Sequence, residues 1–201
     1  PLTDTYPASV LIEITNLNDD DTARVALEDI LGLALADELI IDAVVAQSEA
    51  QCAAFWGLRE GVPEAQRHEG TGSIKHDVSV PVSRVSEFLR EANKRVHEQM
   101  PAARICAFGH MGDGNIHYNV NQPFDMDKDL FLSQWDIFKK IIHDLVNDME
   151  GSVSAEHGIG LLKREDMATY KNSVALDLMR AVKKTLDPQN IMNPGKVLPD
   201  G

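Results

Sequence analysis

Residues 108–120 read FGHMGDGNIHYNV, and the Asp113-Gly114 pair near their centre is among the strongest short signals for a β-hairpin. If these two residues form the loop, His110 lies directly opposite His117. Side chains alternate along each strand, so the two imidazoles then share one face of the hairpin. Opposed Cβ atoms lie roughly 5 Å apart, which lets two imidazoles bind one divalent ion. The spacing by itself favours the plainer interpretation, two sheet histidines hydrogen-bonded to nearby carbonyl groups.

The other side chains of this stretch divide between the two faces. Asn119, two residues after His117, joins the histidine face. Met111, Ile116 and Tyr118 fall on the opposite face, which we expect to face the core. Two neutral imidazoles need at least one further ligand, usually a carboxylate, to hold a metal ion.

A second stretch, GSVSAEHGIG at residues 151–160, offers that carboxylate. Glu156 and His157 are adjacent, and adjacent side chains of extended chain point in opposite directions. Glu156 could therefore complete a His-His-carboxylate site while His157 faces a reacting substrate. The alternative is a solvated Glu-His pair at the start of a helix, where a carboxylate suits the helix dipole.

The rest of the chain alternates between strand-like and helix-like segments. Short apolar or alternating runs predict strands at 8–15, 40–47, 73–81, 104–111 and 115–120. Amphipathic spacing predicts helices at 19–37, from 48 until Gly61 and Pro63 break the pattern, at 82–100, at 127–150, near 158–169 and at 172–186. This order predicts an α+β fold in which two ferredoxin-like halves share one antiparallel sheet covered by helices, with further helices at the C-terminus.

Composition excludes several classes of partner. The net charge of −13 argues against nucleic acid or an anionic membrane surface as a partner. No apolar run approaches the roughly 20 residues of a membrane-spanning helix, so the chain is not expected to be an integral membrane protein. Cys52 and Cys106 lie among apolar residues and form no CxxC motif, which predicts small buried side chains and favours a reducing, cytoplasmic setting.

Five motifs together resemble the C-terminal, substrate-binding domain of FAD-linked oxidases of the vanillyl-alcohol-oxidase type. Within that family the chain is most similar to the D-2-hydroxyglutarate, D-lactate and glycolate dehydrogenases, and the resemblance covers essentially residues 1–201. Any one motif is weak, but their order is specific. The motifs are LRE (58–60), KHDVSVP (75–81), FGHMGDGNIHYNV (108–120), SAEHGIG (154–160) and LDPQNIMNPGK (186–196).

The resemblance implies a role for particular residues. His110, His117 and Glu156 match the ligands of a divalent metal, zinc-like in the family, and His157 matches a catalytic histidine. Arg59, Lys75 and Asn119 match substrate-binding positions, and Asn193 and Lys196 are candidates for flavin contacts. The hydroxyglutarate enzymes are expected to have a threonine or serine shortly after the arginine. This chain has Gly61, Val62 and Pro63 there, which departs from the pattern of the hydroxyglutarate enzymes.

What the resemblance implies for function is the oxidation of a D-2-hydroxy acid to the 2-oxo acid, with metal-assisted removal of the hydroxyl proton and hydride transfer to FAD. The flavin would sit mainly on an N-terminal FAD domain, a partner that these 201 residues do not contain, so we expect the isolated chain to be inactive. An electron-transfer acceptor is a further possible partner.

Plainer functions fit some of the same residues. Arg59 and Lys75 can be ordinary solvated basic residues. The whole chain can be a free-standing metal-binding or ligand-sensing α+β module without redox activity. A metal-dependent hydrolase is the weaker third alternative, because two histidines, a glutamate and a water also make a hydrolytic site.

Overall fold

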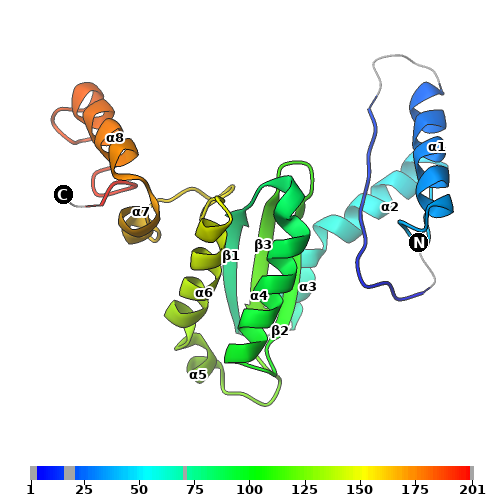
Figure 1. Cartoon of the computed structure of the whole chain (residues 1–201), viewed down its shortest axis with the longest axis horizontal. Coiled ribbons are helices and arrows are strands. Elements are labelled where there is room, and N and C mark those ends of the chain that lie inside the picture. Colours follow the sequence, from blue (N-terminus) through cyan, green and yellow to red (C-terminus); the bar gives the residue numbers. More distant parts are fainter. Residues whose placement is uncertain (1–3, 16–20, 70–71, 200–201) are drawn as a thin grey trace. The chain divides into compact units, whose positions relative to one another are not determined.

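The computed structural model describes residues 4–15, 21–69 and 72–199. The chain divides into two compact units, residues 1–70 and residues 71–201 (Figure 1). Each unit is described by itself. None of the helices in the described parts of the chain is long and apolar enough to cross a membrane.

The first unit is built from helices and irregular segments. It contains α1 (Thr22–Ala36), α2 (Glu49–Glu60) and α3 (Val62–His68). The side chain of Ser48 caps α2 by accepting the backbone N–H of Gln51 at 3.3 Å. The predicted break at Gly61 is confirmed, but the chain turns helical again at once, because Pro63 suits the first turn of a helix.

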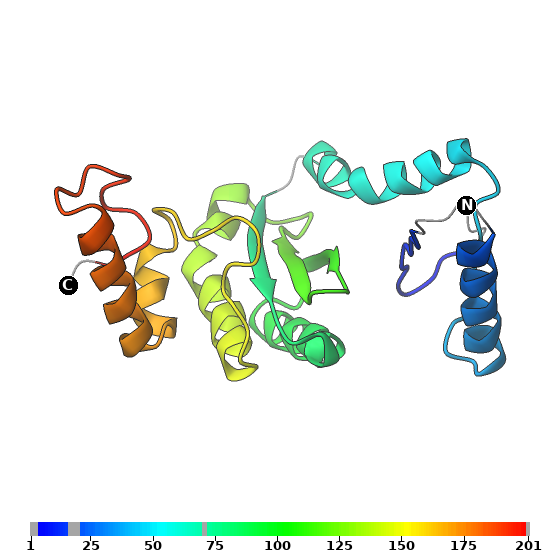
Figure 2. The ribbon, with the colours of Figure 1, turned by 90° about the horizontal axis from the view of Figure 1, so that it is seen from above.

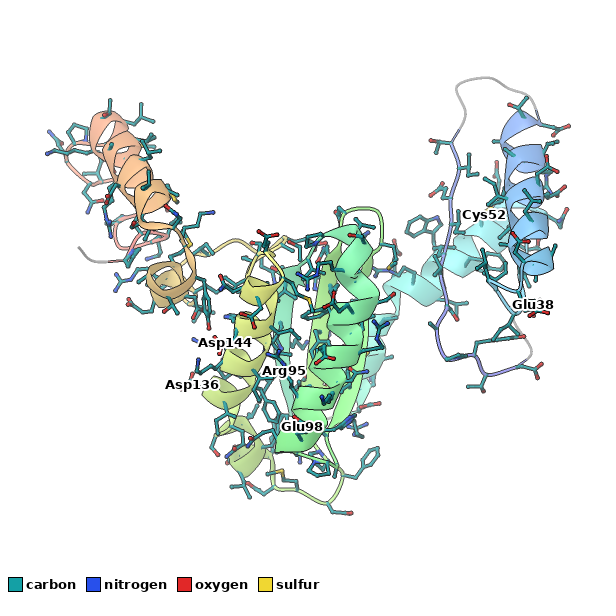
Figure 3. All side chains as sticks on the ribbon, in the orientation of Figure 1. Glu38, Cys52, Arg95, Glu98, Asp136 and Asp144 are labelled. Atoms are coloured by element: carbon teal, nitrogen blue, oxygen red, sulfur yellow. The ribbon has the colours of Figure 1, made fainter. Side chains whose placement is uncertain are left out.

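The strands predicted at 8–15 and 40–47 are wrong, because the described residues of both segments belong to no strand. Both segments have the β-branched residues of a strand, but a strand forms only when a partner bonds its backbone groups. No described residue of this unit is buried. Cys52 on α2 is exposed and Cys106 is half-buried, so the prediction of buried cysteines is also wrong (Figure 3).

The second unit contains the sheet. Strands β1 (Ser73–Ser79), β2 (Arg104–His110) and β3 (Asn115–Asn121) pair antiparallel in the order β1-β3-β2. The strands predicted at 73–81, 104–111 and 115–120 are therefore confirmed. Mixed helices and an antiparallel sheet make the fold α+β, as predicted, although the sheet of the described residues draws its strands from the second unit only.

Helices cover one face of this sheet (Figures 1 and 2). A 3-10 turn (Val82–Arg84) leads into α4 (Val85–Gln99), and α6 (Trp135–Asp148) packs against both α4 and β1. The core centres on Tyr118, whose ring meets that of Phe88 edge-on at 5.8 Å. Each large apolar side chain that is fully buried here stabilises the fold by about 1.5–3 kcal/mol.

The single helix predicted at 127–150 is wrong, because the structure divides it into α5 (Lys128–Leu132) and α6. The Ser133 hydroxyl donates to the carbonyl of Leu130 at 2.7 Å, and the N–H of Gln134 bonds the carbonyl of Phe131 three residues back. These local bonds replace the helical ladder. The C-terminal helices are confirmed as α7 (Arg164–Tyr170) and α8 (Ser173–Leu186), with α7 beginning later than predicted.

Candidate active site

The hairpin between β2 and β3 has a different register from the predicted one. His110 lies opposite Asn115, and His117 lies opposite Phe108, so direct opposition of the two histidines is wrong. The loop is residues 111–114 rather than Asp113-Gly114 alone. The Asp113 carboxylate accepts the backbone N–H of Asn115 at 2.9 Å, while the N–H of Gly114 bonds the carbonyl of His110 at 3.1 Å.

The two histidines nevertheless share a face, because the register error amounts to an even number of residues along the strand. His110 lies two residues from Phe108, the partner of His117, and side chains repeat every second residue. The same face receives Asn119 and, from β1, Lys75 opposite Asn119. Lys75 is exposed and Asn119 is buried. The predicted sharing of one face by His110, His117 and Asn119 therefore holds.

Glu156 lies between the two histidines. Its Oε1 is 3.6 Å from Nε2 of His110, and its Oε2 is 3.5 Å from Nε2 of His117. The side-chain amide of Asn115 donates to Oε1 of Glu156. Two imidazole nitrogens and a carboxylate are a donor set whose chemistry suits zinc, and the role of these three residues as metal ligands stays a prediction.

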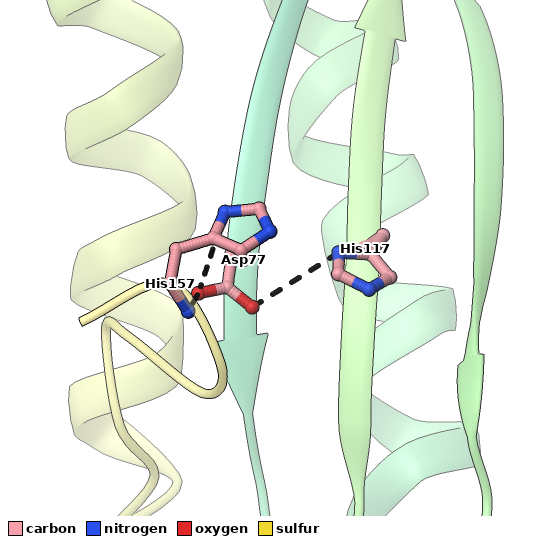
Figure 4. A group of neighbouring side chains, drawn as sticks. All are labelled: Asp77, His117 and His157. Atoms are coloured by element: carbon pink, nitrogen blue, oxygen red, sulfur yellow. Dashed lines mark hydrogen bonds and ion pairs between the residues drawn. The ribbon is translucent and has the colours of Figure 1, made fainter. Parts of the chain in front are cut away.

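His157, the next residue, stacks on His117. The ring centroids are 5.6 Å apart with 30° between the ring planes. Nδ1 of His157 lies 3.8 Å from Oδ2 of Asp77 (Figure 4), and the side chain is 67% exposed. An exposed imidazole beside a candidate metal site can accept a proton from a small molecule bound there.

Asp77 is a candidate site residue that sequence reasoning missed. It lies on β1 opposite His117, it is 4% exposed, and ligand atoms of Asp77, His117 and His157 lie within 4.8 Å of one another. Burial acts to raise the pKa of this carboxyl, but backbone N–H groups of His157 and Glu156 and the ammonium of Lys163 hold it below its ordinary value. The signal was available, because Asp77 follows Lys75 by two residues and so shares its face.

The remaining predicted residues are placed as follows. Arg59 lies on α2, in the first unit, and its role stays a prediction. Asn193, with a φ of 48°, and Lys196 lie after α8. The N–H of Val197 bonds the carbonyl of Gly160 at 2.8 Å, so this C-terminal segment runs beside the residues that follow His157. That neighbourhood is compatible with the predicted flavin contacts, which stay a prediction.

Comparisons with known proteins agree with the motifs. The family model described as "FAD linked oxidases, C-terminal domain" matches residues 1–197. "Probable D-2-hydroxyglutarate dehydrogenase, mitochondrial" of Oryza sativa subsp. japonica is 38% identical over 190 residues, which cover 94% of this chain and 32% of that protein. "D-2-hydroxyglutarate dehydrogenase" of Stutzerimonas stutzeri (strain A1501) is 40% identical over 158 residues, 79% of this chain and 34% of that protein.

A vertebrate protein extends the comparison. "D-2-hydroxyglutarate dehydrogenase, mitochondrial" of Danio rerio is 34% identical over 203 residues, covering 100% of this chain and 36% of that protein. The chain thus spans about a third of the length of the curated relatives it matches. The match over residues 1–197 and the identity to these relatives show that the chain belongs to the family of FAD-linked oxidase C-terminal domains.

Proposed function

We propose that the chain is the substrate- and metal-binding domain of a flavin-dependent dehydrogenase that oxidises a D-2-hydroxy acid to the 2-oxo acid. The observation that carries this is the placement of Glu156 between Nε2 of His110 and Nε2 of His117, with the exposed ring of His157 stacked beside it. The family and the printed names of the relatives support the reaction class. We propose that this domain comprises residues 1–201, four residues more than the family model matches.

In this proposal His110, His117 and Glu156 hold a divalent ion, with zinc favoured by the two imidazoles and one carboxylate. A bound divalent ion would supply Lewis acidity that lowers the pKa of the substrate hydroxyl. The amide of Asn115 keeps the carboxylate of Glu156 oriented towards both histidines.

The proton of the substrate hydroxyl passes to His157. The ring of His157 is exposed on one side and held by its stacking on His117 on the other, so it has room to approach a small molecule. Lys75 and Asn119, paired across β1 and β3 on the same sheet face, bind substrate oxygens in this scheme. Arg59 is proposed as a further carboxylate-binding residue, since a guanidinium binds a carboxylate through two parallel hydrogen bonds.

FAD, when bound, supplies the acceptor for the hydride that leaves the α-carbon. We propose that it is bound mainly by an FAD domain of the same protein, with Asn193 and Lys196 as contacts from this chain, and that an electron-transfer acceptor reoxidises it. The relatives' names favour 2-hydroxyglutarate over lactate or glycolate, while Gly61-Val62-Pro63 departs from the expected pattern. Cytoplasmic localisation stays a prediction.

The test is flavin reduction in the full-length protein that carries this chain, with a panel of D- and L-2-hydroxy acids under anaerobic conditions. We expect rapid bleaching of the flavin band by one D-2-hydroxy acid and about one equivalent of bound divalent metal. His157→Gln should slow bleaching by about 10²–10⁴-fold while metal content is kept. Metal binding without reduction by any hydroxy acid would instead favour the metal-binding module or the hydrolase.

A further inference from the structure

The carboxylate of Asp77 is the most heavily hydrogen-bonded side chain of the candidate site. Its Oδ2 accepts the backbone N–H groups of Ala155 at 3.2 Å, Glu156 at 3.2 Å and His157 at 2.9 Å. Its Oδ1 also lies 3.2 Å from the N–H of Glu156. Three successive N–H groups of one segment therefore converge on one buried carboxylate. This convergence fixes the directions in which the Glu156 and His157 side chains leave the backbone.

The Asp77 carboxylate also lies between the imidazole rings of His117 and His157, with an ion-pair contact to each (Figure 4). Its Oδ1 is 4.0 Å from Nδ1 of His117, while Oε2 of Glu156 faces the other ring nitrogen, Nε2, at 3.5 Å. A carboxylate beside one nitrogen of a histidine can orient the ring through its charge. The Asp77 carboxylate thus lies on the Nδ1 side of the His117 ring, and the Glu156 carboxylate lies on its Nε2 side.

Lys163 explains how such a carboxylate stays buried. Its ammonium lies 3.7 Å from Oδ2 of Asp77, and it donates to the carbonyls of Val153 at 2.8 Å and of Asp77 itself at 3.3 Å. A buried charge is tolerated when it is paired and hydrogen-bonded. Because Oδ2 of Asp77 is already shared between three N–H groups, the Ser154 hydroxyl and an ammonium, little of the hydrogen-bonding capacity of that oxygen is left for an ion.

We propose that Asp77 is a positioning residue, which holds the 154–157 segment and the ring of His117 so that His110, His117 and Glu156 present their ligand atoms together, and which does not itself bind the ion. The inference rests on the metal site of the proposed function. Two donor sets share His117: His110, His117 and Glu156, and Asp77, His117 and His157. The proposal favours the first set, because it gives Asp77 and His157 roles other than metal binding.

Asp77→Asn in the full-length protein tests the proposal, since it keeps the shape of the side chain and removes its charge. We expect zinc affinity, measured by competition with a chromophoric chelator, to fall about 10–100-fold, as it does when a carboxylate behind a metal ligand is lost. Amide hydrogen exchange of residues 155–157, measured on the metal-free protein, should become faster. Glu156→Gln, which removes a ligand, should abolish stoichiometric zinc binding.

Cobalt(II) distinguishes positioning from ligation, because its visible absorption reports the number and type of its ligands. At saturating cobalt, Asp77→Asn should give the wild-type spectrum and Glu156→Gln should not. A changed spectrum in Asp77→Asn would make Asp77 a ligand and overturn the proposal. So would wild-type zinc affinity together with wild-type exchange at residues 155–157.

Asp187→Asn is the matched control. Asp187 is also a buried carboxylate that accepts backbone N–H groups, those of Ile191 at 2.9 Å and Met192 at 3.0 Å, and it pairs with Lys183. This variant should leave zinc affinity and the exchange of residues 155–157 unchanged. An equal effect in the control would mean general loosening and would overturn the assignment.

A second variant and the wild-type protein separate a folding defect from a wrong assignment of Asp77. If Asp77→Asn does not fold, the milder Lys163→Gln, which removes the cationic partner of Asp77, should give a smaller change in zinc affinity and exchange in the same direction. If Lys163→Gln leaves both zinc affinity and exchange unchanged, the proposal is contradicted. A wild-type protein that binds zinc but oxidises no hydroxy acid would overturn the proposed function alone. Exchange on the metal-free protein reports on Asp77 even where no metal binds.

Discussion

Asn115 is a single buried amide on which the candidate metal site depends. It is 4% exposed, its backbone N–H closes the hairpin loop on Asp113, and its side chain donates to Glu156. Asn115→Ala should lower zinc affinity about 10-fold, because Glu156 loses a donor that orients it. Chelator competition measures the change. Asn93→Ala, which removes the acceptor of the Tyr118 hydroxyl on the helix side, should cost stability and leave zinc affinity unchanged.

Two buried histidines on the helix-covered side of the sheet make stability depend on pH. Burial lowers the pKa of His76 and of His143 to about 4; for His143, nearby Asp166 opposes the shift while Lys163 adds to it. The ordinary value is 6.5, so between pH 6.5 and about 4 the unfolded chain binds more protons than the folded one. The free energy of unfolding should therefore fall as pH falls through this window and be unaffected by these groups above it.

The contribution of His143 to the pH dependence of the free energy of unfolding can be measured separately. His143→Phe should reduce the slope of unfolding free energy against pH between 6.5 and 4 by up to about 1.4 kcal/mol per pH unit, the contribution of one proton. Urea unfolding at a series of pH values gives the slope. An unchanged slope would show that folding does not lower the pKa of His143. Asp166 also pairs with Lys139 at 3.1 Å, so we expect it to keep a cationic partner in this variant.

At the scale of the element, the loop of the β2–β3 hairpin, residues 111–114, has a position where only glycine fits. Gly114 has a φ of +74°, and a Cβ there would lie 2.0 Å from the carbonyl oxygen of Val80. Gly114→Ala should destabilise the fold by about 1–3 kcal/mol through backbone strain and the forced shift of that contact. Gly112, in the same loop, has nothing within 4 Å of an added Cβ.

Gly112→Ala is therefore the matched control and should change stability by no more than about 0.5 kcal/mol. Thermal unfolding of both variants measures the difference. Equal effects at the two positions would contradict the loop geometry described above. Gly114→Ala should also weaken zinc binding, since the loop sets the positions of His110 and Asn115 at the two strand ends.

At the scale of the whole molecule, the second unit contains every buried residue among those described. Burial of apolar surface is the main force that makes unfolding cooperative. Residues 71–201 alone should therefore unfold in one cooperative transition and bind zinc as tightly as the whole chain. Residues 1–70 alone should show no cooperative transition. Circular dichroism and chelator competition measure both, and loss of zinc binding in residues 71–201 would contradict the prediction.

Local patterns predicted most elements of the second unit. The alternation in 73–81 and in the hairpin strands gave β1, β2 and β3, and the amphipathic spacing of 82–100 gave α4. The face shared by His110, His117 and Asn119 also followed from alternation. The strands at 8–15 and 40–47 failed because a strand needs a pairing partner, which local composition cannot supply.

By itself the sequence determined the residue types of the site, their order in the family's motifs and the side of each strand on which they lie, since these depend on neighbours in the chain. Only the tertiary structure decided that Glu156 reaches both histidines and that Asp77 holds the 154–157 segment. It also decided the hairpin register, through the Asp113 bond to Asn115 and the positive φ of Gly114. Each of these depends on contacts between separate segments or on backbone hydrogen bonds, which residue spacing alone does not fix.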